Sequence, residues 1–250
     1  MTKVITVTLR KGGSGKTTTA LSLASGLSKQ GQRVLILDLD DQANVATALG
    51  FDRPDIVITD VLRGKASIDE AIVDTTKGFD MIASDLVLAQ IEATLAADPT
   101  KYANVLKGFI DQLRPKYDYI IIDTPPREGM LTIAALTTSD YALIPAQAHY
   151  LALHGLQQAL DLVQRVKASY NPSLQILGIL PTMVQGNTNV AQLFIDKVQA
   201  DYPALLLPFT IPYSIRLSES QLAGETIIDY EPRHPASMAY IELAKHVNGR

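Results

Sequence analysis

The sequence predicts an α/β fold built on one doubly wound, mainly parallel sheet with helices on both faces. Short runs of β-branched and other apolar residues alternate along the chain with longer segments whose apolar residues recur at helical spacing. Parallel strands need crossover connections, and these are usually helices. No repeat, linker or low-complexity tract divides the 250 residues. A single domain over residues 1–250 is therefore expected.

The first predicted unit is a strand, a glycine-rich loop and a helix. Residues 4–8 form a β-branched run that is typical of a buried strand, and the helix is expected over about residues 15–30. Gly31 stands where a helix C-cap is expected. The apolar positions recur every three or four residues and mark the face turned toward the sheet, namely Ala20, Leu23, Ala24 and Leu27.

The same alternation continues along the rest of the chain. Further strands are expected at residues 34–37, 79–82, 119–122, 141–144, 174–180 and 205–209. Further helices are expected at residues 86–97, 102–113, 130–137, 155–169, 190–200 and 236–247. Residues 50–67 are the least regular part. In sheets of this kind ligands bind beyond the carboxyl ends of the strands, so the chemistry is expected there.

Composition excludes several classes of function. The chain has no cysteine, which excludes disulfides, thiolate metal sites, iron–sulfur ligation and cysteine nucleophiles. Its net charge of −4 gives no general attraction to nucleic acid, so any contact with DNA must come from a local basic patch. No apolar run approaches the roughly 18–20 residues that span a bilayer. A cytoplasmic protein is expected.

The strongest chemical signal is the glycine-rich loop between the first strand and the first helix. Its glycines let the main chain curl closely around phosphate groups, and the following helix presents its positive N-terminal end. Lys16 is expected to reach the β- and γ-phosphates, and Thr17 to offer its hydroxyl to Mg²⁺. The alternative is an ordinary strand–turn–helix junction with a chance cluster of glycines. The expected ATP-binding residues of the loop are Lys11, Gly12, Gly13, Ser14, Gly15, Lys16, Thr17 and Thr18.

Two acidic motifs follow at the ends of later strands. Asp38 and Asp40 end the second strand, where carboxylates can hold metal waters or orient an attacking water; alternatively they only cap the next helix. Asp123 ends the buried run 119–122, and a buried aspartate is costly unless it meets a cation or hydrogen-bond donors. A Walker-B role, in which Asp123 holds Mg²⁺ through water, satisfies this requirement.

The loop Lys-Gly-Gly-x-Gly-Lys-Thr-Thr at residues 11–18 resembles the deviant phosphate loop of the ParA/MinD family of dimeric ATPases. The resemblance implies that Lys11 crosses a dimer interface to the partner's nucleotide and neutralises developing phosphate charge. The alternative is that Lys11 is only a solvated loop lysine.

The segment of residues 38–44 resembles the family's Asp-x-Asp-Pro-Gln-x-Asn motif, which implies that Asp40 positions the catalytic water beside the metal. Asp41 stands where the family usually has proline, and we expect it to add charge and loosen the turn.

The resemblance extends from residue 3 to about residue 247. It includes Ile144–Pro145 through Gly155–Leu156, and the C-terminal signatures Ile-Pro-Tyr-Ser-Ile-Arg-Leu-Ser-Glu at 211–219 and Tyr-Glu-Pro-Arg at 230–233. In that family the nucleotide base lies near the segments that match Thr182, Met183 and Pro212, so these are the expected base contacts. Core packing explains Met183 equally well.

The resemblance also implies partners. An ATP-loaded homodimer would bind DNA without sequence preference, with Arg216 at the position of a family arginine that carries this contact. A second family arginine falls at Asn187, and Tyr213 replaces another basic residue, which predicts weaker binding or a different set of contacts. The other candidate cations, each explained equally well as a solvated side chain, are Arg165, Lys167, Lys197, Arg233 and Lys245.

The function expected from the resemblance is an ATPase that partitions plasmid or chromosome cargo on the nucleoid with an adaptor of ParB type. One alternative is that the same cycle positions a protein organelle or cluster, and another is a small-molecule phosphotransferase. The last predicted helix has few cations and reads as a core-packing helix, which argues against membrane binding. Slow turnover stimulated by DNA and a partner would favour the first two functions, and fast turnover that needs a metabolite the third.

Overall fold

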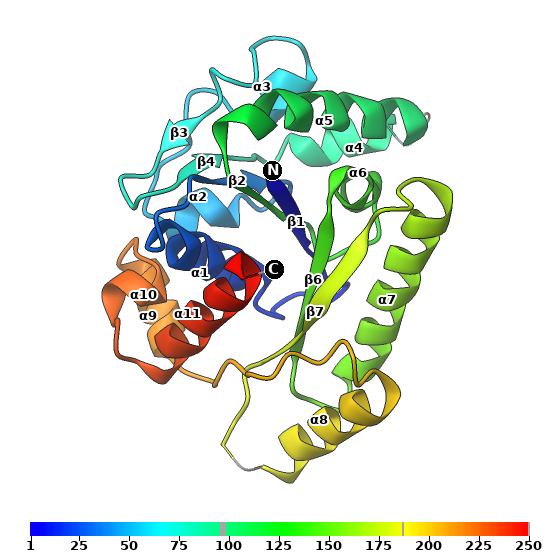
Figure 1. The fold of residues 1–250 in the computed structure, drawn as a ribbon. Coiled ribbons are helices and arrows are strands. Elements are labelled where there is room, and N and C mark those ends of the chain that lie inside the picture. Colours follow the sequence, from blue (N-terminus) through cyan, green and yellow to red (C-terminus); the bar gives the residue numbers. More distant parts are fainter. Residues whose placement is uncertain (96–98, 187, 250) are drawn as a thin grey trace.

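The computed structural model describes residues 1–95, 99–186 and 188–249. Its centre is a seven-stranded sheet in the order β3-β4-β2-β5-β1-β6-β7, with helices on both faces (Figure 1). All neighbouring strands pair in parallel except β3 and β4, which pair antiparallel at one edge. The strands are β1 (Lys3–Val7), β2 (Val34–Asp38), β3 (Val73–Asp74), β4 (Asp80–Ile82), β5 (Tyr119–Asp123), β6 (Tyr141–Gln147) and β7 (Gln175–Thr182). The predicted fold class is confirmed.

The helices cover the sheet in two groups. The N- and C-terminal helices pack together on one face, and α11 lies directly beside α1 (Figure 1). The central helices pack on the other face. The first group is α1 (Lys16–Ser28), α2 (Asn44–Ala48), α9 (Arg216–Leu222), α10 (Ile227–Tyr230) and α11 (Pro235–Asn248). The second is α3 (Ile58–Leu62), α4 (Leu88–Leu95), α5 (Pro99–Leu113), α6 (Met130–Thr138), α7 (Ala152–Ser169) and α8 (Asn189–Asp201).

Alternation along each strand sorts its apolar side chains between the two cores. Ile5, Ile36 and Ile121 belong to the cluster around α1 and α11. Their neighbours Val4 and Leu35 belong to the cluster around α5 and α6. Both faces of a buried parallel strand are apolar, which explains why these strands read as continuous hydrophobic runs in the sequence.

Most predicted elements lie within two or three residues of the observed ones, but one predicted strand is wrong. Residues 205–209 form only an isolated bridge, in which Leu206 pairs with Ile179 at the edge of β7. Pro208 has no N–H to donate and stops any ladder there. The irregular stretch 50–67 contains the short helix α3. The predicted helix 86–97 is observed as α4, and its last residues lie outside the described part.

The register of the sheet determines where the acidic motifs meet. Asp38 at the end of β2 and Val7 at the end of β1 both stand beside Asp123 at the end of β5. The three strands therefore end at one level, and the loops that follow them share one edge. Among the helices described, none is long and apolar enough to cross a membrane.

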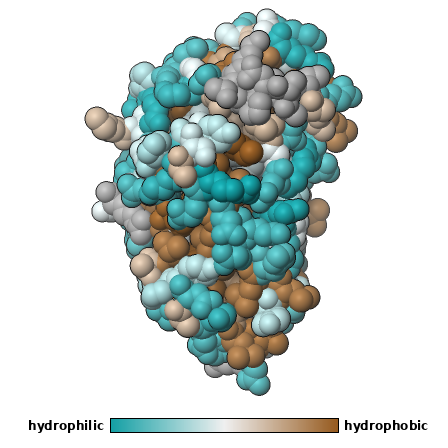
Figure 2. Space-filling model, turned by 90° about the vertical axis from the view of Figure 1, so that its right-hand side faces the viewer, coloured by the Kyte–Doolittle hydropathy of each residue, from teal (hydrophilic) through white to brown (hydrophobic). Residues whose placement is uncertain are grey.

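The face occupied by α7 and α8 is shown in Figure 2, where hydrophobic side chains form patches between hydrophilic ones. Leu193 on α8 is 62% exposed, and Tyr150 and Leu151, which directly precede α7, are 68% and 73% exposed. Large apolar side chains are therefore available for contact with another molecule near the start of α7.

Candidate active site

A hollow of about 790 Å³ opens at the carboxyl edge of the sheet. Residues 12–18 of the glycine-rich loop form one wall, and Asp40, Asn44, Met183 and Gln221 contribute to the others. The loop, the second strand's acidic turn and the segment after β7 thus meet around one space, as the sequence predicts.

Local conformation explains the glycines of the loop. Gly13 and Gly15 have φ angles of 68° and 85°, in the left-handed region that side chains with a Cβ rarely adopt. Gly15 is also the N-cap residue of α1. The carbonyl of Ser14 accepts a hydrogen bond of 3.0 Å from the Thr182 hydroxyl, which ties the loop to the end of β7. The first turn of α1 is therefore directed at the hollow.

Lys16 is the buried cation of the site. Burial lowers the pKa of its ammonium group, and the nearby carboxylates of Asp123 and Asp40 partly offset this effect. Its Nζ donates to the carbonyl of Lys11 at 3.3 Å, within its own loop. A triphosphate in the hollow would offer this ammonium group charged acceptors in place of one carbonyl.

Thr17 and Asp123 form the part of the site that fits a divalent cation. The Thr17 hydroxyl donates to Asp123 Oδ2 at 2.6 Å. The other oxygen, Asp123 Oδ1, is buried and has no hydrogen-bond partner among the described residues. Burial raises the pKa of the Asp123 carboxyl to about 7. A carboxylate and a hydroxyl oxygen are donors that Mg²⁺ prefers, and a cation would compensate for the buried charge.

The two acids at the end of β2 have different surroundings. Asp38 is completely buried, and its oxygens accept the N–H groups of Asp40 at 2.9 Å and Val45 at 3.3 Å. Burial and the neighbouring Asp123 raise the pKa of Asp38 well above its ordinary value. Asp38 thus holds the turn and the start of α2. This arrangement favours the alternative that Asp38 caps the next helix. Asp40 lines the hollow, and burial raises the pKa of its carboxyl.

Asp41 does not loosen its turn, contrary to the expectation from the sequence, because its carboxylate is held by Arg127. The Asp41 carboxylate is buried and lies 2.7 Å from Arg127 Nη2. Burial alone would raise the pKa of Asp41, but hydrogen bonds from Arg127 and Gln42 hold it below its ordinary value. Arg127 lies directly after the Asp-Thr-Pro-Pro motif, and this position is the only sequence signal for the pairing.

A smaller cavity of about 270 Å³ adjoins the loop and is the candidate base pocket. Of the three expected base contacts, Thr182 and Met183 line this cavity, whereas Pro212 is not among the lining residues and instead forms a bridge with Val184. Met183 has a φ of 53°, in the left-handed region that is strained for a side chain of this size.

The walls from α9 and α11 were not predicted from the sequence. Gln221 Nε2 donates to the Thr18 hydroxyl at 3.0 Å, and Tyr240 also lines the base pocket. Neither residue belongs to a motif. Both reach the loop across about 200 residues of sequence, so only tertiary packing brings them there.

Comparison with known proteins shows the family to which the chain belongs. The chain matches, over residues 2–176, a protein-family model described as an AAA domain. It is 40% identical to the sporulation initiation inhibitor protein Soj of Bacillus subtilis over 99% of this chain and 98% of that protein. The chain belongs to the ParA/Soj family of partition ATPases.

Solved structures of similar fold hold nucleotide. A cobyrinic acid a,c-diamide synthase from Mycobacterium smegmatis with bound ADP and magnesium is 31% identical, with a TM-score of 0.87 and coverage of 100% of this chain and 97% of that one. An ATP complex of McdA from Cyanothece is 27% identical, with a TM-score of 0.89 and coverage of 99% and 96%.

The two residues to which the ParA/Soj resemblance gave intermolecular roles both have partners within this chain. Lys11 Nζ donates to Gln147 Oε1 at the end of β6, at 3.0 Å. Arg216 is exposed at the start of α9, and its guanidinium lies 2.6 Å from Glu219 and 3.6 Å from Glu231. Asn187, at the position of the second family arginine, lies outside the described residues.

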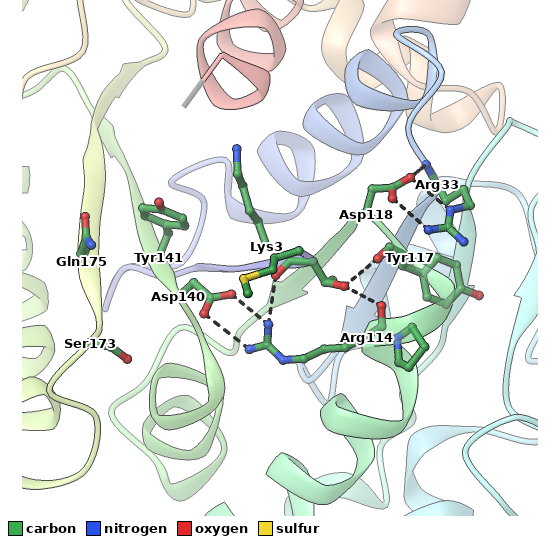
Figure 3. Close-up of a pocket in the computed structure, with 12 residues that line it drawn as sticks. Lys3, Arg33, Arg114, Tyr117, Asp118, Asp140, Tyr141, Ser173 and Gln175 are labelled. Atoms are coloured by element: carbon green, nitrogen blue, oxygen red, sulfur yellow. Dashed lines mark hydrogen bonds and ion pairs between the residues drawn. The ribbon is translucent and has the colours of Figure 1, made fainter.

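A second hollow, of about 770 Å³, lies at the amino edge of the sheet, away from the glycine-rich loop and the acidic motifs (Figure 3). Arg114 donates to the carbonyl of Thr2 and lies 3.2 Å from Asp140, and Arg33 lies 2.9 Å from Asp118. Figure 3 shows these arginines turned toward their carboxylates and not into the open space. The hollow therefore has the character of a structural junction between strand starts.

Proposed function

We propose that this protein is a ParA/Soj-type ATPase that pairs with a second copy when ATP is bound, binds DNA without sequence preference, and moves a plasmid or chromosome cargo through an adaptor of ParB type. It uses ATP and Mg²⁺, since solved structures of similar proteins hold ADP with magnesium or ATP. The observation that carries the proposal is the convergence of Lys16, the Thr17–Asp123 pair and Asp40 on one hollow, in a chain 40% identical to Soj.

Hydrolysis is assigned to residues around this hollow. Lys16 and the N–H groups at the start of α1 bind the β- and γ-phosphates. Thr17 and Asp123 would hold Mg²⁺, which would neutralise charge on the phosphates when bound. Asp40, whose raised pKa favours acceptance of a proton, orients the attacking water.

Two features support a role for a second copy. Lys11 is partly exposed and directly precedes the loop residues that line the hollow, and its ammonium group donates to Gln147, a neutral partner that it can leave at small cost. Tyr150 and Leu151, which follow Gln147 by three and four residues, are largely exposed. An apolar surface beside a transferable cation suits a contact in which Lys11 reaches the partner's nucleotide.

DNA binding is assigned to a patch that includes Arg216 from each copy. Since the chain carries a net charge of −4, the patch must form locally and gains from pairing. Glu219 and Glu231 already neutralise part of the Arg216 charge, so a DNA phosphate has to displace them. Binding is therefore expected to be weak in one copy and strongly dependent on salt.

A fluorescence anisotropy titration of duplex DNA across salt concentrations tests this assignment. ATP-loaded wild-type protein should bind all sequences alike. Arg216→Ala should make the negative slope of log K against log salt less steep by about 1.8, because two phosphate contacts are lost, one from each copy. Arg33→Ala, which removes an arginine paired with Asp118 at the other edge, is the matched control and should bind as wild type does. Equal binding by Arg216→Ala would refute this role, and no binding by wild type would refute the DNA proposal.

The similarity to a cobyrinic acid a,c-diamide synthase favours one alternative, an ATP-dependent reaction on a small molecule. Turnover decides between the two. A partition ATPase should hydrolyse ATP slowly, with stimulation by DNA and the adaptor protein. Turnover that is negligible until a metabolite is added, and indifferent to DNA, would establish the alternative.

A further inference from the structure

Three charged side chains join the loop after β2 to the loop after β5. Arg127 Nη2 lies 2.7 Å from Asp41 Oδ2 and 3.0 Å from Glu92 Oε2, and Arg127 Nε donates to the same Glu92 oxygen at 3.1 Å. The side chains of Asp41 and Glu92 are 9% and 13% exposed, while that of Arg127 is 42% exposed. We call these three residues the Arg127 clamp.

The members of the clamp depend on one another unequally. Both carboxylates are poorly solvated and meet the same guanidinium nitrogen, so each needs Arg127 as its counter-charge. Removing Arg127 leaves two poorly solvated carboxylates without the cation that they share. Removing the Asp41 carboxylate leaves Arg127 still paired with Glu92. The loss of Arg127 is therefore the most disruptive change to the clamp.

The clamp is attached directly to the backbone of Asp40. On the inner side, this residue's N–H donates to Asp38 Oδ1 at 2.9 Å, and its carbonyl accepts from the Ser84 hydroxyl. On the outer side, the next residue is Asp41, held by Arg127. A proline at this position would stiffen the turn through its ring. Here an ion pair to another loop takes the place of that ring.

The other end of the clamp is fixed to the helices of the opposite face. Glu92 on α4 accepts the N–H of Leu131 in the first turn of α6 through its second oxygen, at 3.1 Å. The carbonyl of Arg127 accepts from the Thr132 hydroxyl at 3.0 Å. Arg127 is thereby held at both its main chain and its guanidinium, which gives it the rigidity that a positioning role requires.

We propose that Arg127 is a positioning residue for ATP hydrolysis, which acts through Asp41 to hold the backbone that presents Asp40 to the attacking water. The inference rests on the proposed function, in which Asp40 orients that water. Arg127 itself does not reach the nucleotide hollow, whose walls do not include it. Its effect should therefore fall on the rate of the chemical step and not on nucleotide affinity.

Steady-state kinetics with Mg·ATP in the absence of DNA tests the proposal. Arg127→Gln should lower kcat about tenfold while KM for ATP and the affinity for ADP stay within about twofold. Adding Asp41→Pro to Arg127→Gln should restore kcat to within about threefold of wild type, because proline removes one orphaned carboxylate and stiffens the turn. A double variant that is no faster than Arg127→Gln would overturn the proposal.

Arg165→Gln is the matched control. It breaks the ion pair of 3.2 Å between Arg165 and Glu128, the residue next to Arg127 on the same loop, without touching the turn at 40–42. Its kcat should equal that of wild type. A loss as large as that of Arg127→Gln would show that any charge change near this loop slows turnover, and would overturn the assignment to the clamp.

Two further measurements separate the possible failures. Asp40→Ala with normal turnover would remove the proposed role of Asp40 itself. Slow turnover by Asp40→Ala together with a wild-type kcat for Arg127→Gln would overturn only the positioning role. If Arg127→Gln loses ADP binding and its cooperative unfolding, Arg127→Lys replaces it. Lysine keeps the charge but lacks the fork that serves two acids, so kcat should fall at unchanged ADP affinity, and an unchanged kcat would overturn the proposal.

Discussion

At the amino edge of the sheet Arg33 and Arg114 each face a carboxylate, whereas at the carboxyl edge Asp40 and Asp123 share the ammonium group of Lys16. Asp38 lies beside both of these acids. One edge balances its charges within the chain, and the other leaves the Asp123 Oδ1 oxygen without a partner among the described residues. The size of a hollow therefore does not identify a ligand-binding site. The two hollows, of about 770 and 790 Å³, are nearly equal, but only one lacks charge compensation that a ligand can supply.

The comparison predicts that changes at the carboxyl edge alter function and that changes at the amino edge alter stability. Lys16→Ala should have the largest effect, because the phosphates lose their buried cation. ATP affinity measured by calorimetry should fall roughly a hundredfold or more, while the fold persists. Unchanged ATP affinity in a folded Lys16→Ala variant would contradict the assignment of nucleotide binding to the carboxyl edge.

Lys11→Ala should keep nucleotide binding and lose turnover. If Lys11 supplies charge across the dimer, kcat should fall by roughly a thousandfold, as for the loss of an arginine finger. ATP-dependent dimerisation, followed by light scattering, should weaken as well. Gln147→Ala, which removes only the hydrogen-bond partner of Lys11 within its own chain, is the control and should keep turnover.

Asp40→Ala should slow hydrolysis about a hundredfold, the effect of a lost general base, without preventing ATP binding. Size-exclusion chromatography should then show the variant accumulating as an ATP-bound dimer. Asp38→Asn is the informative comparison, because Asp38 holds the turn and not the water. A larger loss of kcat in Asp38→Asn than in Asp40→Ala would exchange the two assignments.

At the amino edge, Asp140→Ala should lower the free energy of unfolding by about 1–2 kcal/mol. The Asp140 carboxylate accepts the N–H of the buried Val4 at 2.8 Å, and that donor would be left without its partner. Chemical denaturation measures the loss, and ATP affinity should not change. A drop in ATP affinity with unaltered stability would contradict the division between the edges.

Arg33→Ala should have the smallest effect. The Arg33–Asp118 pair is largely exposed, so its loss should leave the denaturation midpoint unchanged within error. A clear shift of the midpoint in chemical denaturation would mean that this hollow has tighter packing than its exposure indicates.

Sequence periodicity predicted the alternating elements because buried parallel strands and their crossover helices leave strong apolar patterns. The prediction failed at residues 205–209, where an apolar run with Pro208 makes only one bridge to β7. It also missed α9, whose seven residues are too few to show a helical period.

The candidate site shows a similar division. The proximity of Lys16, Thr17, Asp40 and Asp123 could be predicted because their motifs lie at predicted strand ends. The contacts of Gln221 with Thr18 and of Arg127 with Asp41 join segments far apart in the chain, and local pattern carries no information about such pairs. The opposite surroundings of Asp38 and Asp40 likewise depend on the depth of each carboxylate below the surface.

The packing of α1 against α11 has a consequence for synthesis on the ribosome. A Cβ on Gly26 would lie only 2.8 Å from the side chain of Ala244, so the first and last helices meet at a closely fitted surface. At about 5–20 residues per second, α1 would wait roughly 10–45 s for α11 to be synthesised. During that interval its outer face lacks its native cover, so a nascent chain or a fragment without α11 is expected to be the form most dependent on chaperones.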